Sequence, residues 1–382
     1  MTEAAPKRGS PDAAGPDPAP DSSGTVTPDR PSAAASGPLA TLGRVRPGRP
    51  LAIALAALVV ALAVGVSVGP ADLSPATVAE ALLVRLPWHP ALSVPPIDTA
   101  IVWQIRLPRV ILGALVGAML AGGGAAYQGV FRNPLADPYL LGVAAGAGLG
   151  ATLIIVGGGS TGLLPAAAFT GAVGAVTMTY VLGSGAGGTG GSTASIVLAG
   201  VAVAALLTAI QEYLQQQHTQ ELQQIYTWIL GSLSLASWSD IALILPYVVI
   251  AAALLLAHRR LLDVLRVGEA EAGSLGVNVA RLRLTVVLAA TLGTAAAVAV
   301  TGLIGFVGII VPHTVRLTWG ASYRIVLPVS MVGGAAFLVL ADVVARTVQA
   351  PAEVPLTVIT ATIGAPFFLF VLRSRRTRRD LS

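Results

Sequence analysis

The chain has 382 residues, of which 54% are hydrophobic and only 11% are charged, and its mean hydropathy is +0.78. Soluble domains carry about 25% charged residues, so this composition excludes an ordinary water-soluble domain and predicts a protein that lies in a lipid bilayer. The chain has no cysteine, which excludes disulfides, iron–sulfur clusters and thiolate zinc sites. Lys7 is the only lysine. A Walker A loop needs its own lysine after a glycine-rich turn, so we expect any ATP hydrolysis on a partner chain.

The N-terminal residues differ sharply in composition from the rest of the chain. Residues 1–50 are rich in Pro, Ala, Gly, Ser and Asp and hold few bulky apolar side chains, which predicts a disordered cytoplasmic tail. The first apolar run, residues 51–69, is close to the ~20 residues that a helix needs to cross a bilayer. A cleaved signal peptide is the alternative for this run, but its core would be shorter and nearer the N-terminus.

Nine further apolar runs follow the first. They lie near residues 108–127, 139–157, 163–183, 194–214, 240–257, 284–302, 304–320, 325–346 and 355–372. The sequence therefore predicts an all-α integral membrane protein with about ten transmembrane helices between residues 51 and 372.

The arginines predict the orientation of these spans, because cytoplasmic loops carry an excess of Arg and Lys. Arg44, Arg46 and Arg49 precede the first span, and the basic tail 373–382 follows the last. Both termini are therefore expected in the cytoplasm, which requires an even number of spans. The loop from residue 258 to 283 then also faces inward, and it holds five arginines. The expected location is the cell membrane, with multiple passes.

Two enzyme-like patterns occur without the context that their chemistry needs. GAGGTG at 185–190 does not open a helix of a strand–helix–strand unit, and GGSTG at 158–162 has no predicted strand-to-helix elbow. The four histidines lack metal-ligand spacing, and His313 is interpreted as a packed helix-end residue. We therefore expect no catalytic residue, no metal site and no cofactor bound by this chain.

Polar residues inside or beside apolar spans are costly and mark packing contacts, pathways or docking points. Arg106 and Arg109, in RLPR, are either interfacial anchors or a docking site for an acidic partner. Asp342 and Arg346 lie four residues apart on one helix face and form either a local ion pair or a second docking point.

Three longer polar segments allow two interpretations each. Residues 127–142 contain two prolines in an apolar stretch, so they form either a gate or pathway wall, or a plain loop. Residues 265–283 begin with acidic residues and end with arginines, which suits a short helix, either solvated or bound by a partner. Residues 211–224 either line a pore mouth or are solvated.

Seven strings in the chain resemble those of one known family and occur in the order of that family. They are VWQIRLPR at 102–109, NPLADPYLLGVAAGAG at 133–148, WILGSLS at 228–234, GEAEAGSLGV at 268–277, GLIGFVGIIVPHTVR at 302–316, ADVVAR at 341–346 and EVPLTVITATIGAPFF at 353–368. Together they resemble the FecCD family of ABC importer permeases for ferric-siderophores, heme and cobalamin. One departure is Thr357, which stands where the family usually has glycine.

The resemblance implies a type II ABC importer permease that moves a ferric-siderophore, heme or cobalamin-type substrate into the cytoplasm by ATP-driven alternating access. It implies a permease dimer, two cytoplasmic ATPase subunits that bind ATP and Mg²⁺, and an extracytoplasmic binding protein, with no nucleic acid. The alternative is an ion-coupled secondary transporter, for which Asp137 and Glu212 are the only candidate carboxylates. The substrate, the identity of the second permease and the role of the tail stay open.

The resemblance also assigns residues to three tasks. Arg106 and Arg346 match the positions that dock the binding protein. The ATPase-coupling segment, residues 268–280, contains Glu269, Ala272, Leu275, Gly276 and Val277. The cytoplasmic gate contains Asn133, Leu135, Ser192 and Thr193.

Overall fold

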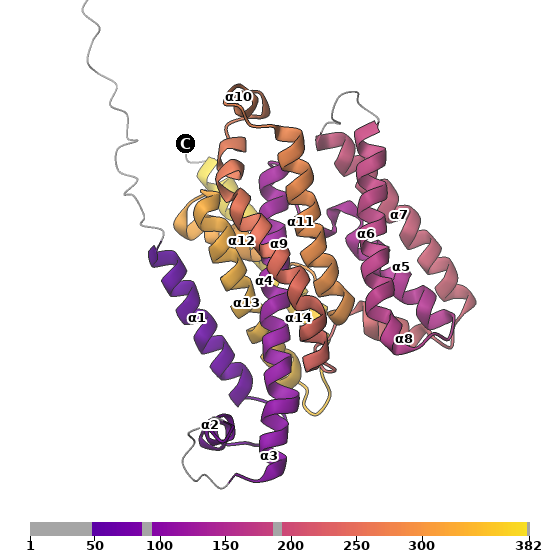
Figure 1. Cartoon of the computed structure of the whole chain (residues 1–382), viewed down its shortest axis with the longest axis vertical. Helices are drawn as coiled ribbons and strands as arrows, with labels where there is room; N and C mark the ends of the chain where they lie inside the picture. The colour runs from indigo at the N-terminus through magenta and orange to yellow at the C-terminus, as the bar shows by residue number, and fades with distance from the viewer. Residues whose placement is uncertain (1–47, 86–93, 186–192, 380–382) are drawn as a thin grey trace, which may run out of the picture. The chain divides into compact units, whose positions relative to one another are not determined.

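The computed structural model describes residues 48–85, 94–185 and 193–379, and every regular element in these ranges is a helix (Figure 1). The described residues belong to one compact unit, Val45–Ser382. Most of the predicted N-terminal tail lies outside the described residues. The predicted all-α class is confirmed.

The elements are given in chain order. They are α1 Gly48–Ser67, α2 Pro75–Leu83, α3 Pro96–Ala100, the π-helical η1 Ile101–Arg106, α4 Leu107–Val130, the 3-10 turn η2 Pro138–Leu141, α5 Val143–Val156, the 3-10 turn η3 Thr161–Leu163, α6 Leu164–Gly185, α7 Thr193–Gln217, α8 Leu222–Ile229, α9 Trp238–Leu265, α10 Glu269–Ser274, α11 Val279–Thr301, α12 Val307–Trp319, α13 Tyr323–Thr347 and α14 Leu356–Arg379. Nine of the ten predicted apolar runs each correspond to one α-helix, and the run at 139–157 is divided into η2 and α5. Short extra helices are α2, α3, α8 and α10.

The spans differ in length. Within the described residues, seven helices are long and apolar enough to cross a membrane, and α5 and the apolar part of α14, Leu356–Phe370, are shorter. The run predicted at 139–157 begins as a 3-10 turn because Gly142, at φ 86°, breaks the helix before α5. The predicted C-terminal tail 373–382 begins inside α14, which continues to Arg379.

The span around α4 is longer than its sequence predicts. The apolar run begins at residue 108, whereas the helix is continuous over Pro96–Val130 through α3, η1 and α4. The charges of Arg106 and Arg109 suggest that the span begins after them. In the structure both arginines lie within the continuous helix, where their side chains are buried and hydrogen-bonded.

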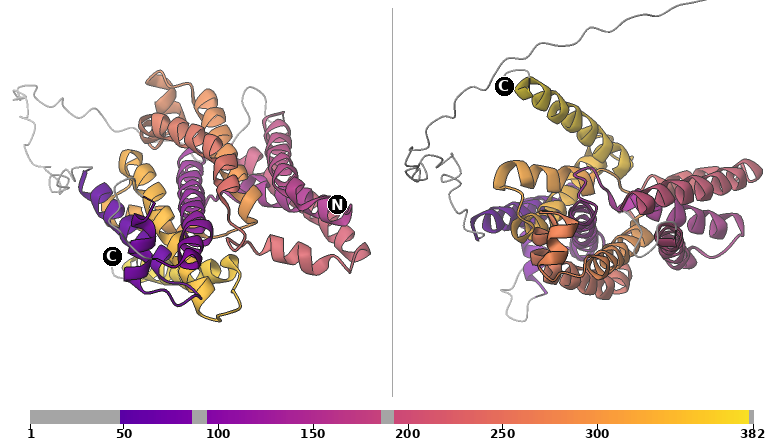
Figure 2. Two further views of the ribbon diagram at one scale, coloured as in Figure 1. Left: turned by 60° about the horizontal axis from the view of Figure 1, so that its bottom comes forward. Right: turned by 90° about the horizontal axis from the view of Figure 1, so that it is seen from above.

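Helix α4 is the central element of the bundle. It contacts α13, α11, α12 and α9 (Figure 2). Glycines allow these helices to approach closely: a Cβ on Gly124 would lie 2.0 Å from the carbonyl oxygen of Gly308, and one on Gly117 would lie 2.2 Å from that of Gly334. Small residues at helix interfaces are typical of membrane proteins, where close packing replaces the hydrophobic driving force.

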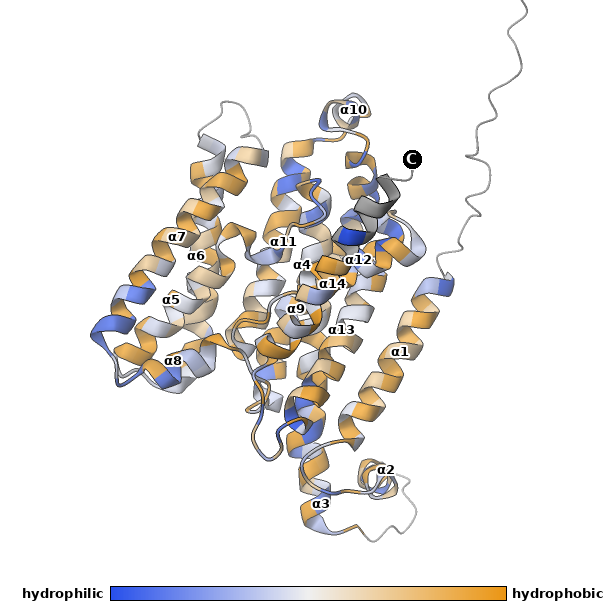
Figure 3. Cartoon of the chain, turned by 180° about the vertical axis from the view of Figure 1, so that it is seen from behind, coloured by the Kyte–Doolittle hydropathy of each residue, from blue (hydrophilic) through white to orange (hydrophobic). Residues whose placement is uncertain are grey.

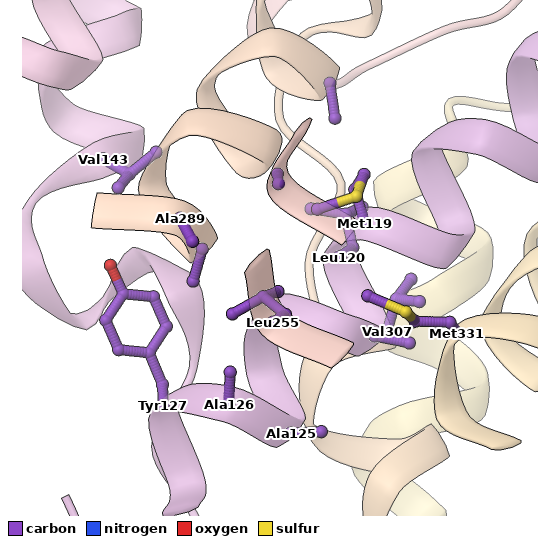
Figure 4. Close-up of a cluster of buried hydrophobic side chains, with 14 of the residues drawn as sticks. Met119, Leu120, Ala125, Ala126, Tyr127, Val143, Leu255, Ala289, Val307 and Met331 are labelled. Atoms are coloured by element: carbon purple, nitrogen blue, oxygen red, sulfur yellow. The ribbon is translucent and has the colours of Figure 1, made fainter. Parts of the chain in front are cut away.

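The buried core lies around α4, and its neighbours fill it with apolar side chains (Figure 4). Met119 and Tyr127 of α4 and Leu255 of α9 are fully buried members of this core. The Tyr127 hydroxyl is 2.8 Å from Thr291 Oγ1 of α11. This partner satisfies the one polar group that the ring carries into the core.

Large apolar side chains cover the outside as well. Val59 of α1, Val181 of α6, Leu198 of α7 and Val249 of α9 are each more than half exposed. Figure 3 shows hydrophobic colouring over most of α1, α6 and α7. Soluble monomers rarely expose apolar surface on this scale, so these faces are suited to contact with lipid.

A second group of helices, α5 to α8, packs beside α11. Helix α5 contacts α6, α7 and α8, and α6 contacts α11 (Figure 1). Gly146 of α5 and Gly171 of α6 face each other so closely that a Cβ on either would lie within 2.2 Å of the other's carbonyl oxygen. These two glycines therefore lie in a close-packed interface between α5 and α6.

Candidate functional site

Arg106 lies at the end of the bundle that carries α3, which we call the α3 end (Figure 1). Its side chain is 3% exposed. The guanidinium donates to the carbonyl oxygens of Val66 at 2.9 Å, Ser67 at 2.7 Å and Ala71 at 2.6 Å. The last carbonyls of a helix have no partner within the helix, so Arg106 caps the C-terminal end of α1.

Arg346 of α13 binds the same helix end. It is 2% exposed, and its Nη2 donates to the Gly65 carbonyl oxygen at 2.5 Å. The structure thus brings the two predicted docking residues, Arg106 and Arg346, together on the last turn of α1. Both guanidinium groups are occupied by internal contacts, and docking stays a prediction.

Arg109 forms an ion-pair network that the sequence analysis did not identify. Its guanidinium donates to both carboxylate oxygens of Asp342, at 2.8 to 3.0 Å, and to both of Glu353, at 2.6 and 2.9 Å. Asp342 also lies 3.5 Å from Arg346 Nε. The predicted pair of Asp342 and Arg346 exists, but the contact with Arg109 is shorter. Charged residues in apolar spans are expected to pair with one another. Because Arg109 is 233 residues from Asp342 and 244 residues from Glu353 in sequence, no local pattern indicates that they are its partners.

The opposite end of the bundle carries α10, and we call it the α10 end. The predicted short helix in the coupling segment is present as Glu269–Ser274. Ala272 is buried, Val277 is half-buried, and Leu275 is 69% exposed. Gly276 has φ 84°, which turns the chain sharply after α10. Leu275 is the residue that follows α10, so its exposed side chain lies at the C-terminal end of this short helix.

One carboxylate joins the coupling segment to the predicted gate. Glu269 Oε1 accepts a 2.6 Å bond from Arg283 Nη2 of α11 and a 3.3 Å bond from Thr193 Oγ1 at the start of α7. The family resemblance assigns Glu269 and Thr193 to different tasks, and the structure places them in contact. Ser192 and most of the GAGGTG pattern lie outside the described residues.

The other gate residues lie in the turn after α4, also at the α10 end. Asn133 and Leu135 are both exposed, and Asn133 Oδ1 accepts a 3.0 Å bond from the Leu135 backbone N–H. Asp137, four residues after Asn133, accepts a 2.9 Å bond from the backbone N–H of Tyr139 and so caps η2. The segment is an ordered turn, whose polar groups are satisfied locally as irregular backbone in a membrane requires.

His313, the histidine singled out in the sequence, packs inside the helix bundle. His313 is buried inside α12, with its ring 6.1 Å from that of Phe367 in an edge-on arrangement. In the part of the chain that the structure describes, no group of three His, Cys, Asp or Glu residues is placed to hold a metal ion. The geometry therefore offers polar links at the two ends of the bundle.

Known proteins resemble this chain over most of its length. The model of the FecCD transport family matches residues 57–374. The cobalamin import system permease protein BtuC of Halobacterium salinarum is 42% identical, over 84% of this chain and 95% of that protein. The hemin transport system permease protein HmuU of Yersinia pestis is 38% identical, over 88% of this chain and 99% of that protein.

A solved structure has the same fold. An inward-facing conformation of an ABC transporter, described as metal-chelate type, aligns with a TM-score of 0.75 and 30% identity over 85% of this chain and 98% of its own. These matches are to ABC transporter permeases, so the alternative of an ion-coupled secondary transporter is wrong. The chain belongs to the FecCD transport family and is a membrane permease subunit of an ABC importer.

Proposed function

We propose that this permease imports a ferric-siderophore, heme or cobalamin-type substrate. Relatives that are 35% to 42% identical are named for cobalamin, hemin and Fe(3+)-citrate, which supports a bulky metal-chelate substrate class. The permease works as one of two such subunits. A binding protein outside the cell delivers the substrate, and two cytoplasmic ATPase subunits bind ATP and Mg²⁺. The chain itself catalyses no bond chemistry and holds no cofactor.

The observation that carries the mechanism is the shared carboxylate of Glu269. An ATPase that binds α10 through Leu275 would displace Glu269, and the bonds of this carboxylate to Thr193 and Arg283 connect it to α7 and α11. Movement of α10 would then shift the start of α7, where the predicted gate lies. ATP hydrolysis in the partner thus opens or closes the pathway without a reaction in this chain.

The proposed orientation places the α10 end in the cytoplasm and the α3 end outside. The five arginines of residues 258–283, which lie at the end of α9, the start of α11 and in the segment between them, are then cytoplasmic together with both termini, as the positive-inside rule favours. The binding protein would dock at the α3 end near Arg106 and Arg346. Since both guanidinium groups are bonded to carbonyls of α1, docking through them would have to exchange these internal bonds for acidic side chains of the binding protein.

The test is transport by the assembled complex in proteoliposomes. We expect uptake of a labelled ferric-siderophore, hemin or cobalamin that requires both the binding protein and ATP on the ATPase side. A catalytically dead ATPase subunit is the control, and it should abolish uptake. Uptake driven by an ion gradient without ATP would contradict the proposed mechanism, and ATP-driven uptake of none of the three would contradict the substrate class.

A further inference from the structure

A cavity of about 270 Å³ opens at the α10 end, and arginines from three helices or helix ends line it. Arg132 follows α4, Arg266 follows α9, and Arg316 lies in the last turn of α12. Gln128 and Tyr323 complete the polar lining. We call this the arginine cavity. Gln128 and Arg132 lie in the polar segment 127–142, whereas Arg266, Arg316 and Tyr323 belong to none of the predicted docking, coupling or gate sets.

A buried neutral side chain holds Arg316 in place. Gln128 is 2% exposed, and its Nε2 donates to the carbonyl oxygens of Ala136 at 3.1 Å and Gly308 at 2.9 Å. Its Oε1 is therefore turned toward Arg316 and accepts a bond from Nη2. Tyr323, 5% exposed, lines the same cavity. Because Gln128 is neutral, its bond orients the guanidinium and leaves the positive charge uncompensated.

The acidic groups nearby do not balance the arginines. Asp263 lies 3.7 Å from Arg266 Nη1. Its carboxylate already accepts bonds from Ser322 Oγ at 2.8 Å and from the Tyr323 backbone N–H at 2.6 Å, and it also faces Arg324, at 3.6 Å. In the described ranges, no carboxylate lies within 4.0 Å of the guanidinium of Arg132 or Arg316.

Helix dipoles are the simpler explanation for arginines at these positions. The C-terminal end of a helix carries about half a negative charge, and α4, α9 and α12 all end at the cavity. Together these ends offset about one and a half positive charges, which is less than three arginines supply. The dipoles therefore account for only part of the positive charge.

The backbone of Arg132 is also strained. Its φ is 50°, a left-handed conformation that costs a non-glycine residue about 1–2 kcal/mol.

We propose that the arginine cavity binds a phosphate group, carried either by an anionic lipid headgroup or by free phosphate. The guanidinium fork matches two phosphate oxygens at once. A water molecule occupies about 30 Å³, so the cavity has room for a phosphate and the start of an ester chain. Basic pockets between membrane helices on the cytoplasmic side are suited to lipid headgroups.

A phosphate bound in the arginine cavity would link the ends of three helices next to the turn that holds Asn133 and Leu135. Pro134, between the gate residues Asn133 and Leu135, also lines the cavity. A phosphate bound to Arg132, Arg266 and Arg316 therefore stabilises the α10 end of α4, α9 and α12 relative to one another. This inference depends neither on the transported substrate nor on the ATPase, so it can fail or hold independently of the proposed function.

The first test measures lipid retention by the purified full-length permease with native mass spectrometry, in micelles that contain phosphatidylglycerol or phosphatidylcholine. We expect wild type to retain phosphatidylglycerol selectively. Arg132→Gln and Arg316→Gln should each weaken retention by about tenfold, the effect of one charge-assisted hydrogen bond. Arg324→Gln is the matched control, because Arg324 is exposed at the same end but does not line the cavity, and it should retain lipid like wild type.

The second test titrates inorganic phosphate and follows the melting temperature of the same proteins. A rise for wild type and the Arg324 variant, but not for the Arg132 variant, without lipid retention assigns the site to free phosphate. Retention of phosphatidylglycerol without a phosphate effect assigns it to lipid. Arg132 is exposed, so its variant should fold even if the Arg316 variant does not. The proposal is overturned if wild type responds to neither ligand, or if the Arg132 and Arg324 variants behave alike.

Discussion

Arg106 and Arg346 at the α3 end bind the C-terminal end of α1 and are also the predicted docking residues. Each places a buried guanidinium on carbonyl oxygens of the last turn of α1. In lipid, such carbonyls have no water to bind. The two arginines therefore hold α1 against α4 and α13 whether or not a binding protein contacts them, and substitutions there will change stability as well as docking.

The first prediction separates these two roles. Arg106→Gln should lower the stability of the detergent-solubilised permease by about 2–3 kcal/mol, because three carbonyls lose a charged donor. Arg85→Gln, an exposed arginine near the same end that lies over the Trp103 ring, should leave the melting temperature nearly unchanged. An Arg106→Gln protein as stable as wild type but unable to import substrate would contradict the capping role and favour docking alone.

The second prediction concerns the network of Arg109. Arg109→Leu leaves the carboxylate of Asp342, 3% exposed, without its closest cation, and breaking a buried pair in this way costs about 3–5 kcal/mol. Adding Asp342→Leu should recover part of that loss, because no unpaired buried acid is left at that position. Melting temperatures of the two single variants and the double variant check the sign of the interaction. A double variant less stable than Arg109→Leu would argue against the pairing.

At the scale of elements, α4 depends on glycines that permit backbone contact. The third prediction is that Gly124→Ala destabilises the permease by about 1–3 kcal/mol, the usual cost of overpacking, because the added methyl would meet the Gly308 carbonyl at 2.0 Å. Gly174→Ala on α6, where nothing lies within 4 Å, is the matched control and should be neutral or slightly stabilising. Equal melting temperatures for both variants would show that α4 and α12 can separate at little cost.

The fourth prediction addresses the contact between α7, α10 and α11. Glu269→Gln should reduce substrate import per ATP hydrolysed, because the neutral amide binds Arg283 and Thr193 more weakly than the carboxylate does. ATP hydrolysis itself should continue, since this chain only transmits the movement. Import and hydrolysis are measured together in proteoliposomes. Glu221→Gln, just before α8, is the control.

A covalent link offers a rescue of that contact. The chain contains no cysteine, so Thr193→Cys with Glu269→Cys introduces the only two thiols. The reduced double variant should be uncoupled like Glu269→Gln, and a short thiol-reactive cross-linker should restore import if the two residues move together. Import that stays low after complete cross-linking would show that the contact must break during transport.

At the scale of the whole molecule, the fifth prediction is the orientation in the membrane. A single cysteine at Leu275, exposed at the α10 end, should react with a membrane-impermeant maleimide only from the cytoplasmic side. A single cysteine at Leu235 should react only from outside: it is 92% exposed, and the nearby Trp238 donates to the Trp103 carbonyl oxygen at the α3 end. The reverse pattern would invert the proposed topology and remove the ATPase contact from α10.

Several features of the fold could be predicted because they depend on local sequence. The length of an apolar run sets whether a helix can cross the bilayer, and all ten predicted runs are helices in the structure. The short helix at Glu269–Ser274 was also predicted, since acidic residues at its start and arginines after it are local signals. The four-residue spacing of Asp342 and Arg346 also indicated an ion pair, and that pair is present in the structure.

The partners were decided only by the tertiary structure. Arg346 binds Gly65, Arg109 binds Asp342 and Glu353, and Thr193 meets Glu269 across distances in sequence that no local pattern spans. The arginine cavity likewise exists only where helix ends from distant parts of the chain converge. Hydrophobic length acts within one helix, so the sequence alone determined where the apolar helices lie, while the extension of the α4 span to Pro96 required the structure. A buried charge is satisfied by whichever group the packing brings near it, so the network of contacts required the folded chain.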